Sequence, residues 1–174
     1  LEYSKNAFAD ELQTFLIAGS TPAAPLSYAW TLPDAIGATV KVRASDAADS
    51  TVVDTSNANF EIKGSLTLIA PNGTEIWRVG EARNVTWTKT GTIATVKLEY
   101  STNGGTTYPN VMTASTDATT GTYAWTIPDS IGATVRVKVT HTGDATVNDA
   151  SNANFEVKGS VTLTAPNGSE VWVV

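Results

Sequence analysis

Residues 122–139 read TYAWTIPDSIGATVRVKV and combine two runs of alternating side chains with a turn between them. Apolar side chains occupy every second position, at Tyr123, Trp125 and Ile127 before the turn and at Val135, Val137 and Val139 after it. A period of two residues places such side chains on one face of a β-strand. Pro128-Asp129 supplies the turn chemistry between the runs. The stretch therefore predicts two strands, each with one buried face.

The same alternation continues on both sides of this stretch. It is present at Val85 and Trp87, at Val96, Leu98 and Tyr100, and at Phe155 and Val157, with further strands expected at 66–69, 75–79 and near 108–113. Seven or eight short strands in one repeat of 95 residues (65–159) are typical of an immunoglobulin or fibronectin-III-like β-sandwich. The sequence has no long run with a helical period; residues 7–17 come closest, and at most a helical turn is expected there.

An internal repeat sets the domain organisation. Residues 28–79 recur at 123–174 with a constant offset of 95, and 34 of the 52 aligned positions are identical. The tetrapeptide Leu1-Glu2-Tyr3-Ser4 recurs as Leu98-Glu99-Tyr100-Ser101 at an offset of 97. A fixed period of this length indicates tandem copies of one structural unit.

The repeat predicts three segments along the chain. Residues 1–64 are the C-terminal part of one repeat, residues 65–159 a complete repeat, and residues 160–174 the first strands of a following repeat. The first segment lacks strands that match residues 66–89, so we expect either upstream sequence or a neighbouring molecule to complete it. A connection of about two residues at Gly64-Ser65 predicts a semi-rigid rod of stacked domains.

Composition excludes several classes of function. The net charge is −6 and the 11 basic residues are scattered, which argues against a nucleic-acid partner. The absence of cysteine excludes disulfides, thiolate metal sites and thiol nucleophiles. The 28 Thr and 13 Ser suit the outer faces of strands. No apolar run reaches the roughly 20 residues that span a bilayer, so no membrane span is expected in this segment.

The order of these motifs resembles the bacterial and fungal Ig-like repeat related to the yeast cell-wall glucan synthesis proteins, a Ser/Thr-rich family that is often anchored to the cell surface. The resemblance covers the central repeat and both partial copies, through residues 68–77, 79–80, 85–88, 96–101, 123–129 and 151–157. It implies an Ig-like fold that serves as a repeated building block of large surface, stalk or surface-layer proteins and carries no known catalytic residues.

No catalytic residues are predicted. His141 is the only histidine, and the aligned position one repeat earlier is Asp46. Since a general base would not be exchanged between copies of one module, we interpret His141 as a surface residue at a strand end. Zinc hydrolysis and Cys-His chemistry lack their residues, and no G-x-S-x-G motif presents a serine nucleophile.

One cluster of oxygen-bearing side chains is a calcium candidate. It contains Asp144, Asn148, Asp149 and Asn152, followed by Asn154, and is mirrored by Asp46, Asp49, Asp54, Asn57 and Asn59. Calcium prefers such hard oxygen ligands. Asx side chains before a strand more often form hydrogen bonds with their own backbone in turns. We therefore favour turns over a bound calcium ion, and no cofactor is predicted.

The tryptophans are predicted to lie in the hydrophobic core and not to form an exposed surface on which sugars stack. Trp87 and Trp125 alternate in phase with core valines and are predicted to be buried, whereas the phase of Trp77 is ambiguous. Tyr108 lies in a Gly- and Thr-rich loop and is the ligand-binding candidate.

Asn72, Asn84 and Asn167 match the N-glycosylation pattern, although the Asn-Gly turn alone explains the first and the last.

The sequence leads to one expected function and two alternatives. We expect a structural repeat of a secreted or cell-surface protein, in a surface layer, stalk or extracellular filament. Its partners would be neighbouring repeats, other copies of itself or cell-wall carbohydrate. The alternatives are a carbohydrate-binding or adhesion module and an accessory domain of a secreted enzyme.

Overall fold

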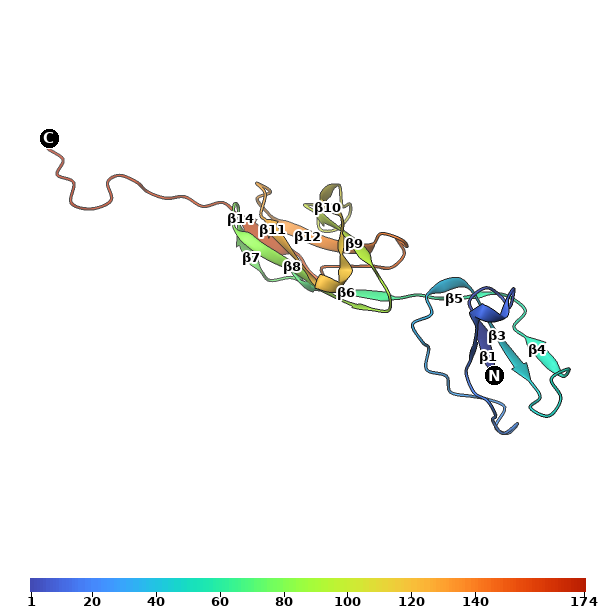
Figure 1. Ribbon diagram of the computed structural model, residues 1–174. Helices are drawn as coiled ribbons and strands as arrows, with labels where there is room; N and C mark the ends of the chain where they lie inside the picture. Colours follow the sequence, from blue (N-terminus) through green and yellow to red (C-terminus); the bar gives the residue numbers. More distant parts are fainter. The chain divides into compact units, whose positions relative to one another are not determined.

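The computed structural model describes all residues 1–174, which form fourteen β-strands and two short 3₁₀ helices (Figure 1). The helices are η1 (Glu11–Gln13) and η2 (Ala118–Thr120). The all-β prediction is therefore confirmed, and η1 falls within the residues that were expected to form a helical turn. No helix is both long enough and apolar enough to cross a membrane.

The chain divides into two compact units. Unit 1 comprises Leu1–Ser65 and Thr90–Thr92, and unit 2 comprises Leu66–Lys89 and Ile93–Val174. The strands of unit 1 form one sheet in the order β2-β1-β3-β4, with β5 also paired to β3. They are β1 (Glu2–Ser4), β2 (Thr14–Leu16), β3 (Gly37–Ser45), β4 (Val53–Thr55) and β5 (Phe60–Ile62).

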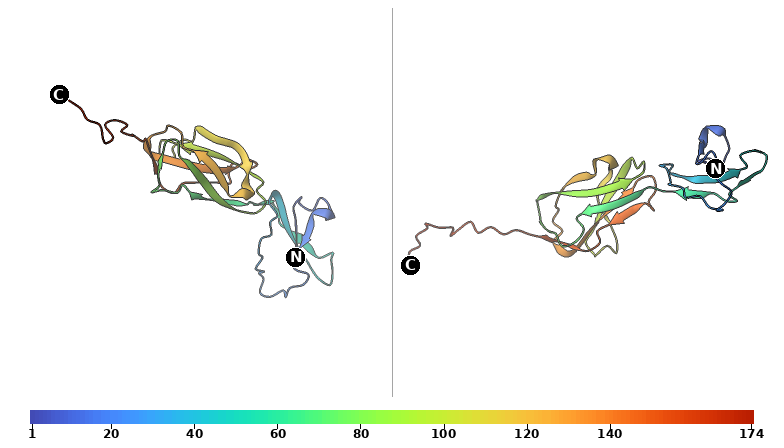
Figure 2. Two further views of the ribbon diagram at one scale, coloured as in Figure 1. Left: turned by 60° about the vertical axis from the view of Figure 1, so that its left-hand side comes forward. Right: turned by 90° about the horizontal axis from the view of Figure 1, so that it is seen from below.

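Unit 2 contains two sheets that contribute to one buried cluster (Figures 1 and 2). The larger sheet has the order β10-β9-β12-β14-β7, with β13 paired to β12, and the smaller has the order β11-β8-β6. β14 pairs with β7 in parallel, whereas β9 with β10, β12 with β9, β13 and β14, and β8 with β11 pair antiparallel. The strands are β6 (Ser65–Ala70), β7 (Ile76–Arg78), β8 (Ala82–Thr90), β9 (Thr95–Ser101), β10 (Asn110–Asp117), β11 (Thr122–Thr126), β12 (Gly132–His141), β13 (Asn148–Ala150) and β14 (Phe155–Lys158).

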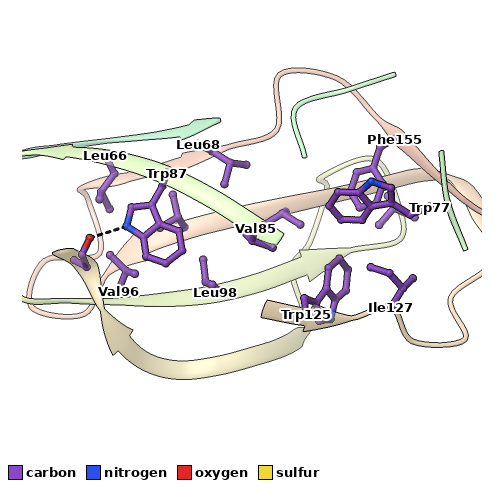
Figure 3. Packing of buried hydrophobic residues seen from close by; sticks show 14 of the residues in the cluster. Leu66, Leu68, Trp77, Val85, Trp87, Val96, Leu98, Trp125, Ile127 and Phe155 are labelled. Atoms are coloured by element: carbon purple, nitrogen blue, oxygen red, sulfur yellow. Dashed lines mark hydrogen bonds between the residues drawn. The ribbon is translucent and has the colours of Figure 1, made fainter. Parts of the chain in front are cut away.

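The core of unit 2 follows the alternation in the sequence. Val135, Val137 and Val139 are at most 1% exposed, as their spacing on β12 predicts. Trp87 and Trp125 are also buried, which confirms their predicted place in the core (Figure 3). These side chains come from both sheets, so the sheets cover each other's apolar faces.

The tryptophans pack in two ways within this core. Trp77, whose phase was ambiguous, is buried, and its ring centroid lies 5.1 Å from that of Phe155 and 6.1 Å from that of Trp125 (Figure 3). The indole N–H of Trp87 donates a hydrogen bond of 3.0 Å to the carbonyl of Ala118 (Figure 3). This bond satisfies the one polar group that the Trp87 side chain buries.

One strand differs from its predicted position. The strand expected near residues 108–113 is β10, which begins at Asn110 and continues to Asp117. It reaches this length because two register shifts, between Val111 and Thr113 and between Thr113 and Thr116, let it stay paired with β9.

The same tetrapeptide adopts different structures in the two units. Residues 123–126, Tyr-Ala-Trp-Thr, lie in β11, whereas the identical residues 28–31 form no strand. The cause is the pairing partner, because β11 bonds to β8 and unit 1 contains no strand that matches β8. Residues 160–174 also contain no helix or strand. Their assignment to a following repeat stays a prediction.

Candidate functional site

A polar hollow lies on the outer face of unit 2, over strands β9 and β12. Its volume is about 300 Å³, and its lining consists of Lys97, Glu99, Ala114, Lys138, Thr140, His141, Thr142 and Ala145. Alternation places four of these residues, because the valines of β12 and the apolar residues of β9 point inward, and Lys97, Glu99, Lys138 and Thr140 between them point outward. The site is therefore part of the sheet itself and rests on rigid elements.

Glu99 is the acidic group at the centre of this face. It lies between Leu98 and Tyr100 on β9, and the residue is only 9% exposed. Two ammonium groups cover it, with Lys97 Nζ 2.6 Å and Lys138 Nζ 3.7 Å from its carboxylate oxygens. A carboxylate tolerates burial when it is paired in this way. The buried charge is therefore balanced within the protein.

Tyr108 borders the same face and is half-buried. The ammonium of Lys138 lies 4.8 Å from the centroid of its ring, which is a cation–π arrangement. Burial raises the pKa of the Tyr108 phenol above its ordinary value of 10.0, and the nearby Arg136 opposes this only in part. The phenol is therefore neutral at physiological pH and offers an O–H donor rather than a base.

Unit 1 repeats this arrangement with other side chains. The guanidinium of Arg43 lies 2.7 Å from the Glu2 carboxylate and 4.4 Å from the centroid of the Phe8 ring. Arg43 and Lys138 are aligned in the internal repeat, and so are Glu2 and Glu99. A carboxylate, a cation and an aromatic ring therefore recur together on the outer face of both sheets, which no short motif in the sequence indicated.

The loops that carry the two rings share a backbone conformation. The Ser4 hydroxyl accepts hydrogen bonds from the N–H groups of Asn6 and Phe8, at 3.2 and 2.9 Å. In unit 2 the Ser101 hydroxyl accepts from Asn103 and Gly105, at 3.1 and 2.9 Å. Phe8 has a φ of 62°, where the aligned Gly105 has 87°. The left-handed conformation is thus kept even where glycine is replaced.

Thr140 lines the hollow, but its polar group is buried beneath the surface. The residue is 9% exposed, and its hydroxyl oxygen is buried without a hydrogen-bond partner. A buried hydroxyl that makes no hydrogen bond costs stability because it has lost its bonds to water.

We expect Thr140→Val to raise the free energy of unfolding of unit 2 by about 1 kcal/mol, since valine keeps the shape and removes the unpaired hydroxyl. Urea denaturation followed by tryptophan fluorescence measures this change. A loss of stability would show that the hydroxyl is paired in solution.

Three of the four calcium candidates, Asp144, Asn148 and Asp149, use their side chains in hydrogen bonds within the chain. Asp144 accepts from the N–H and hydroxyl of Thr146, and Asn148 donates to the carbonyls of Ala145 and Thr146. No group of three or more His, Cys, Asp or Glu side chains that could hold a metal ion occurs in the chain.

The remaining two candidates link elements that are distant in sequence. The Asp149 carboxylate accepts from the N–H of Leu68 at 2.7 Å, and the N–H of Asn152 donates to Asn72 Oδ1 at 2.6 Å. The four residues therefore tie turns and strands together. The sequence predicted the turns. It did not predict that Asp149 contacts β6 or that Asn152 contacts the turn after β6.

The other residues singled out in the sequence are dispersed. His141 ends β12, is half-buried and borders the hollow, and its backbone N–H donates to the carbonyl of Val147. Asn84 is exposed on β8, Asn72 is half-buried in the turn before β7, and Asn167 is exposed in the C-terminal segment. The structure brings Asn72 next to Asn152 but does not bring these residues into one site.

Comparison with known proteins gives no further guide to this face: no protein-family model, curated protein or solved structure matches the chain. The polar hollow presents charges that are paired with each other, and the ring of Tyr108 lies beside Lys138 at its border.

Proposed function

We propose that this chain is part of a tandem array of Ig-like β-sandwich repeats that acts as a semi-rigid spacer in a large secreted or cell-surface protein. The observation that carries the proposal is the repeat itself, with 34 of 52 aligned positions identical at a constant offset. Near-identical copies favour a role that depends on repetition, because each copy provides the same core and the same contacts with its neighbours.

The contacts shared by the two units support this proposal. The charge pair, the cation–π contact and the serine-centred loop recur in unit 1 and unit 2. Only residues 63 and 64 separate β5 from β6, which leaves little chain to act as a hinge. Repeated stable units joined by short connections are suited to holding a functional domain at a distance from a surface.

Stiffness is the property that tests the spacer role. Ala38 and Ala133 are aligned in the repeat and exposed, and the chain contains no cysteine, so Ala38→Cys with Ala133→Cys places one spin label on each unit. We expect pulsed electron–electron double resonance of the dilute chain to give a narrow distribution of the distance between the two labels. An inserted Gly-Ser-Gly-Ser after Gly64 should broaden it clearly.

A wild-type distribution as broad as that of the insertion variant would refute the spacer role. A glycan array gives a second, independent outcome, since a spacer should bind no glycan above background. Binding that is lost in Tyr108→Ala would instead identify a carbohydrate-binding module at the outer face of unit 2.

A further inference from the structure

The short segment Thr90–Thr92 belongs to one repeat in the sequence and to the other unit in the structure. It ends β8 and begins the loop to β9, so it lies within the repeat of residues 65–159. In the structure, however, these three residues are part of unit 1 together with Leu1–Ser65. The residues of unit 1 that hold this segment therefore mark a docking surface.

Asp34 holds the segment through two hydrogen bonds. The N–H of Thr92 donates to Asp34 Oδ1 at 3.0 Å, and the Thr92 hydroxyl donates to Asp34 Oδ2. Hydrogen bonds to a carboxylate are charge-assisted and are stronger than those between neutral groups. One side chain thus satisfies both a main-chain donor and a side-chain donor of Thr92.

Gly91 fits against the same turn because it has no side chain. A β-carbon at this position would lie 3.0 Å from Ile36 Cδ1, 3.2 Å from Asp34 Oδ1 and 3.4 Å from the Cα of Gly64. The first two distances are shorter than ordinary van der Waals contacts, and the φ of 84° is unfavourable for other residues. Gly91 and Thr92 are therefore matched to the turn both in shape and in hydrogen bonding.

The turn that carries Asp34 recurs in unit 2. Residues 33–36 (Pro-Asp-Ala-Ile) are aligned with residues 128–131 (Pro-Asp-Ser-Ile). In both turns the N–H of the third residue donates to the carbonyl of the proline at 2.8 Å. Each repeat therefore presents an aspartate and an isoleucine on a turn with the same backbone hydrogen bond.

In unit 2 this turn is open, although unit 2 contains strands that unit 1 lacks. Ile131 is 65% exposed, and Asp129 is exposed as well. Strands β6, β7 and β8 are present in unit 2 and leave the turn uncovered. The exposure of the turn is therefore a property of the repeat itself and does not arise from missing strands.

We propose that the Pro-Asp-x-Ile turn of each repeat is a docking surface that binds the Gly-Thr segment after β8 of the repeat that follows it. The partner is recognised by a carboxylate that accepts two hydrogen bonds and by an isoleucine that packs against a glycine. Asp34 and Ile36 form the occupied surface, and Asp129 and Ile131 provide the same surface for the next copy. The proposal rests on the tandem array in the proposed function, and it names the contact through which neighbouring repeats recognise each other.

This contact gives the array a second attachment between neighbouring repeats. The first is the covalent connection at Gly64-Ser65, and the second is the docked segment at the far end of β8. Two attachments restrict rotations that a single short connection permits. The stiffness of the array therefore depends on the docking turn as well as on the length of the connection.

Asp34→Ala tests the contact in the full chain. Asp34 is exposed, so the substitution leaves the core of unit 1 intact. In the chain labelled at Ala38→Cys and Ala133→Cys, we expect the distance distribution to broaden toward that of the Gly-Ser-Gly-Ser insertion variant, although the connection keeps its length. Asp129→Ala is the same change one repeat later and should leave the distribution unchanged. A wild-type distribution in Asp34→Ala would overturn the proposal and leave the spacer role intact.

Gly91→Ala tests the other side of the contact. The added methyl group meets Ile36 and Asp34, so we expect the same broadening. Gly80→Ala is the matched control, because Gly80 has a φ of 83° but a β-carbon there has no neighbour within 4 Å. Both variants carry the same backbone strain, and only Gly91→Ala blocks the docking surface. Equal distributions for the two variants would contradict the proposed fit.

The Thr92 amide gives a second measurement that does not depend on stiffness. Its N–H donates to the Asp34 carboxylate, so its proton resonance should shift as acid protonates that carboxylate. We expect this shift in NMR spectra of the wild type and of Asp129→Ala, and its loss in Asp34→Asn. The same shift in Asp34→Asn and the wild type would overturn the contact. A broad spin-label distribution with a Thr92 resonance that follows Asp34 would instead refute the spacer role alone, so the two failures can be told apart.

Discussion

Trp77→Ala is expected to lower the free energy of unfolding of unit 2 by about 3–5 kcal/mol, the range for a large aromatic side chain removed from a core. Trp77 is 7% exposed and packs between Trp125 and Phe155, whose ring centroids lie 6.1 and 5.1 Å away. Alanine leaves a cavity between two sheets that cannot close without moving β7. Urea denaturation with fluorescence detection measures the loss.

Trp172→Ala provides the control for this prediction. Trp172 is the same residue one repeat later and is 74% exposed, so the dilute variant should keep the wild-type stability of unit 2. The comparison separates the effect of core burial from that of losing a fluorescent tryptophan. A cost below 1 kcal/mol for Trp77→Ala would contradict the position of Trp77 in the core.

Much of unit 2 could be predicted because alternation with a period of two encodes which face of a strand is buried. The valines of β12 and the tryptophans of β8 and β11 follow this pattern and lie in the core. The pattern was ambiguous at Trp77, since Ile76 and Val79 are both apolar neighbours. Its burial follows from the parallel pairing of β7 with β14, which joins residues that are distant in sequence.

The outer face could not be predicted from local patterns. Glu99 and Lys138 lie on different strands, and their proximity follows from the antiparallel register in which they are opposite each other. The missing hydrogen bond of the Thr140 hydroxyl likewise depends on the surrounding side chains. Sequence patterns therefore indicated which residues point outward but not which of them lie together.

Partner strands also decide whether a segment becomes a strand at all. Residues 28–31 and 123–126 are identical, yet only the second set is paired, by β8. Intrinsic β-propensity is the same in both, so the difference comes from tertiary context.

Ser151→Ala is expected to cost unit 2 about 2–6 kcal/mol, because it leaves two buried polar groups without a partner and each costs about 1–3 kcal/mol. The residue is 2% exposed, and its hydroxyl donates to the carbonyl of Pro71 at 2.7 Å and accepts from the N–H of Val137 at 3.0 Å. One hydroxyl thus joins β12 to the turn that follows β6. Ser56→Ala is the matched control, since Ser56 is half-buried and accepts from the N–H of Val42 at 3.2 Å within unit 1. Ser56→Ala should leave the urea unfolding transition of unit 2 unchanged. If Ser151→Ala and the wild type unfolded at the same urea concentration, the Ser151 hydroxyl would not stabilise the junction between β12 and the turn after β6.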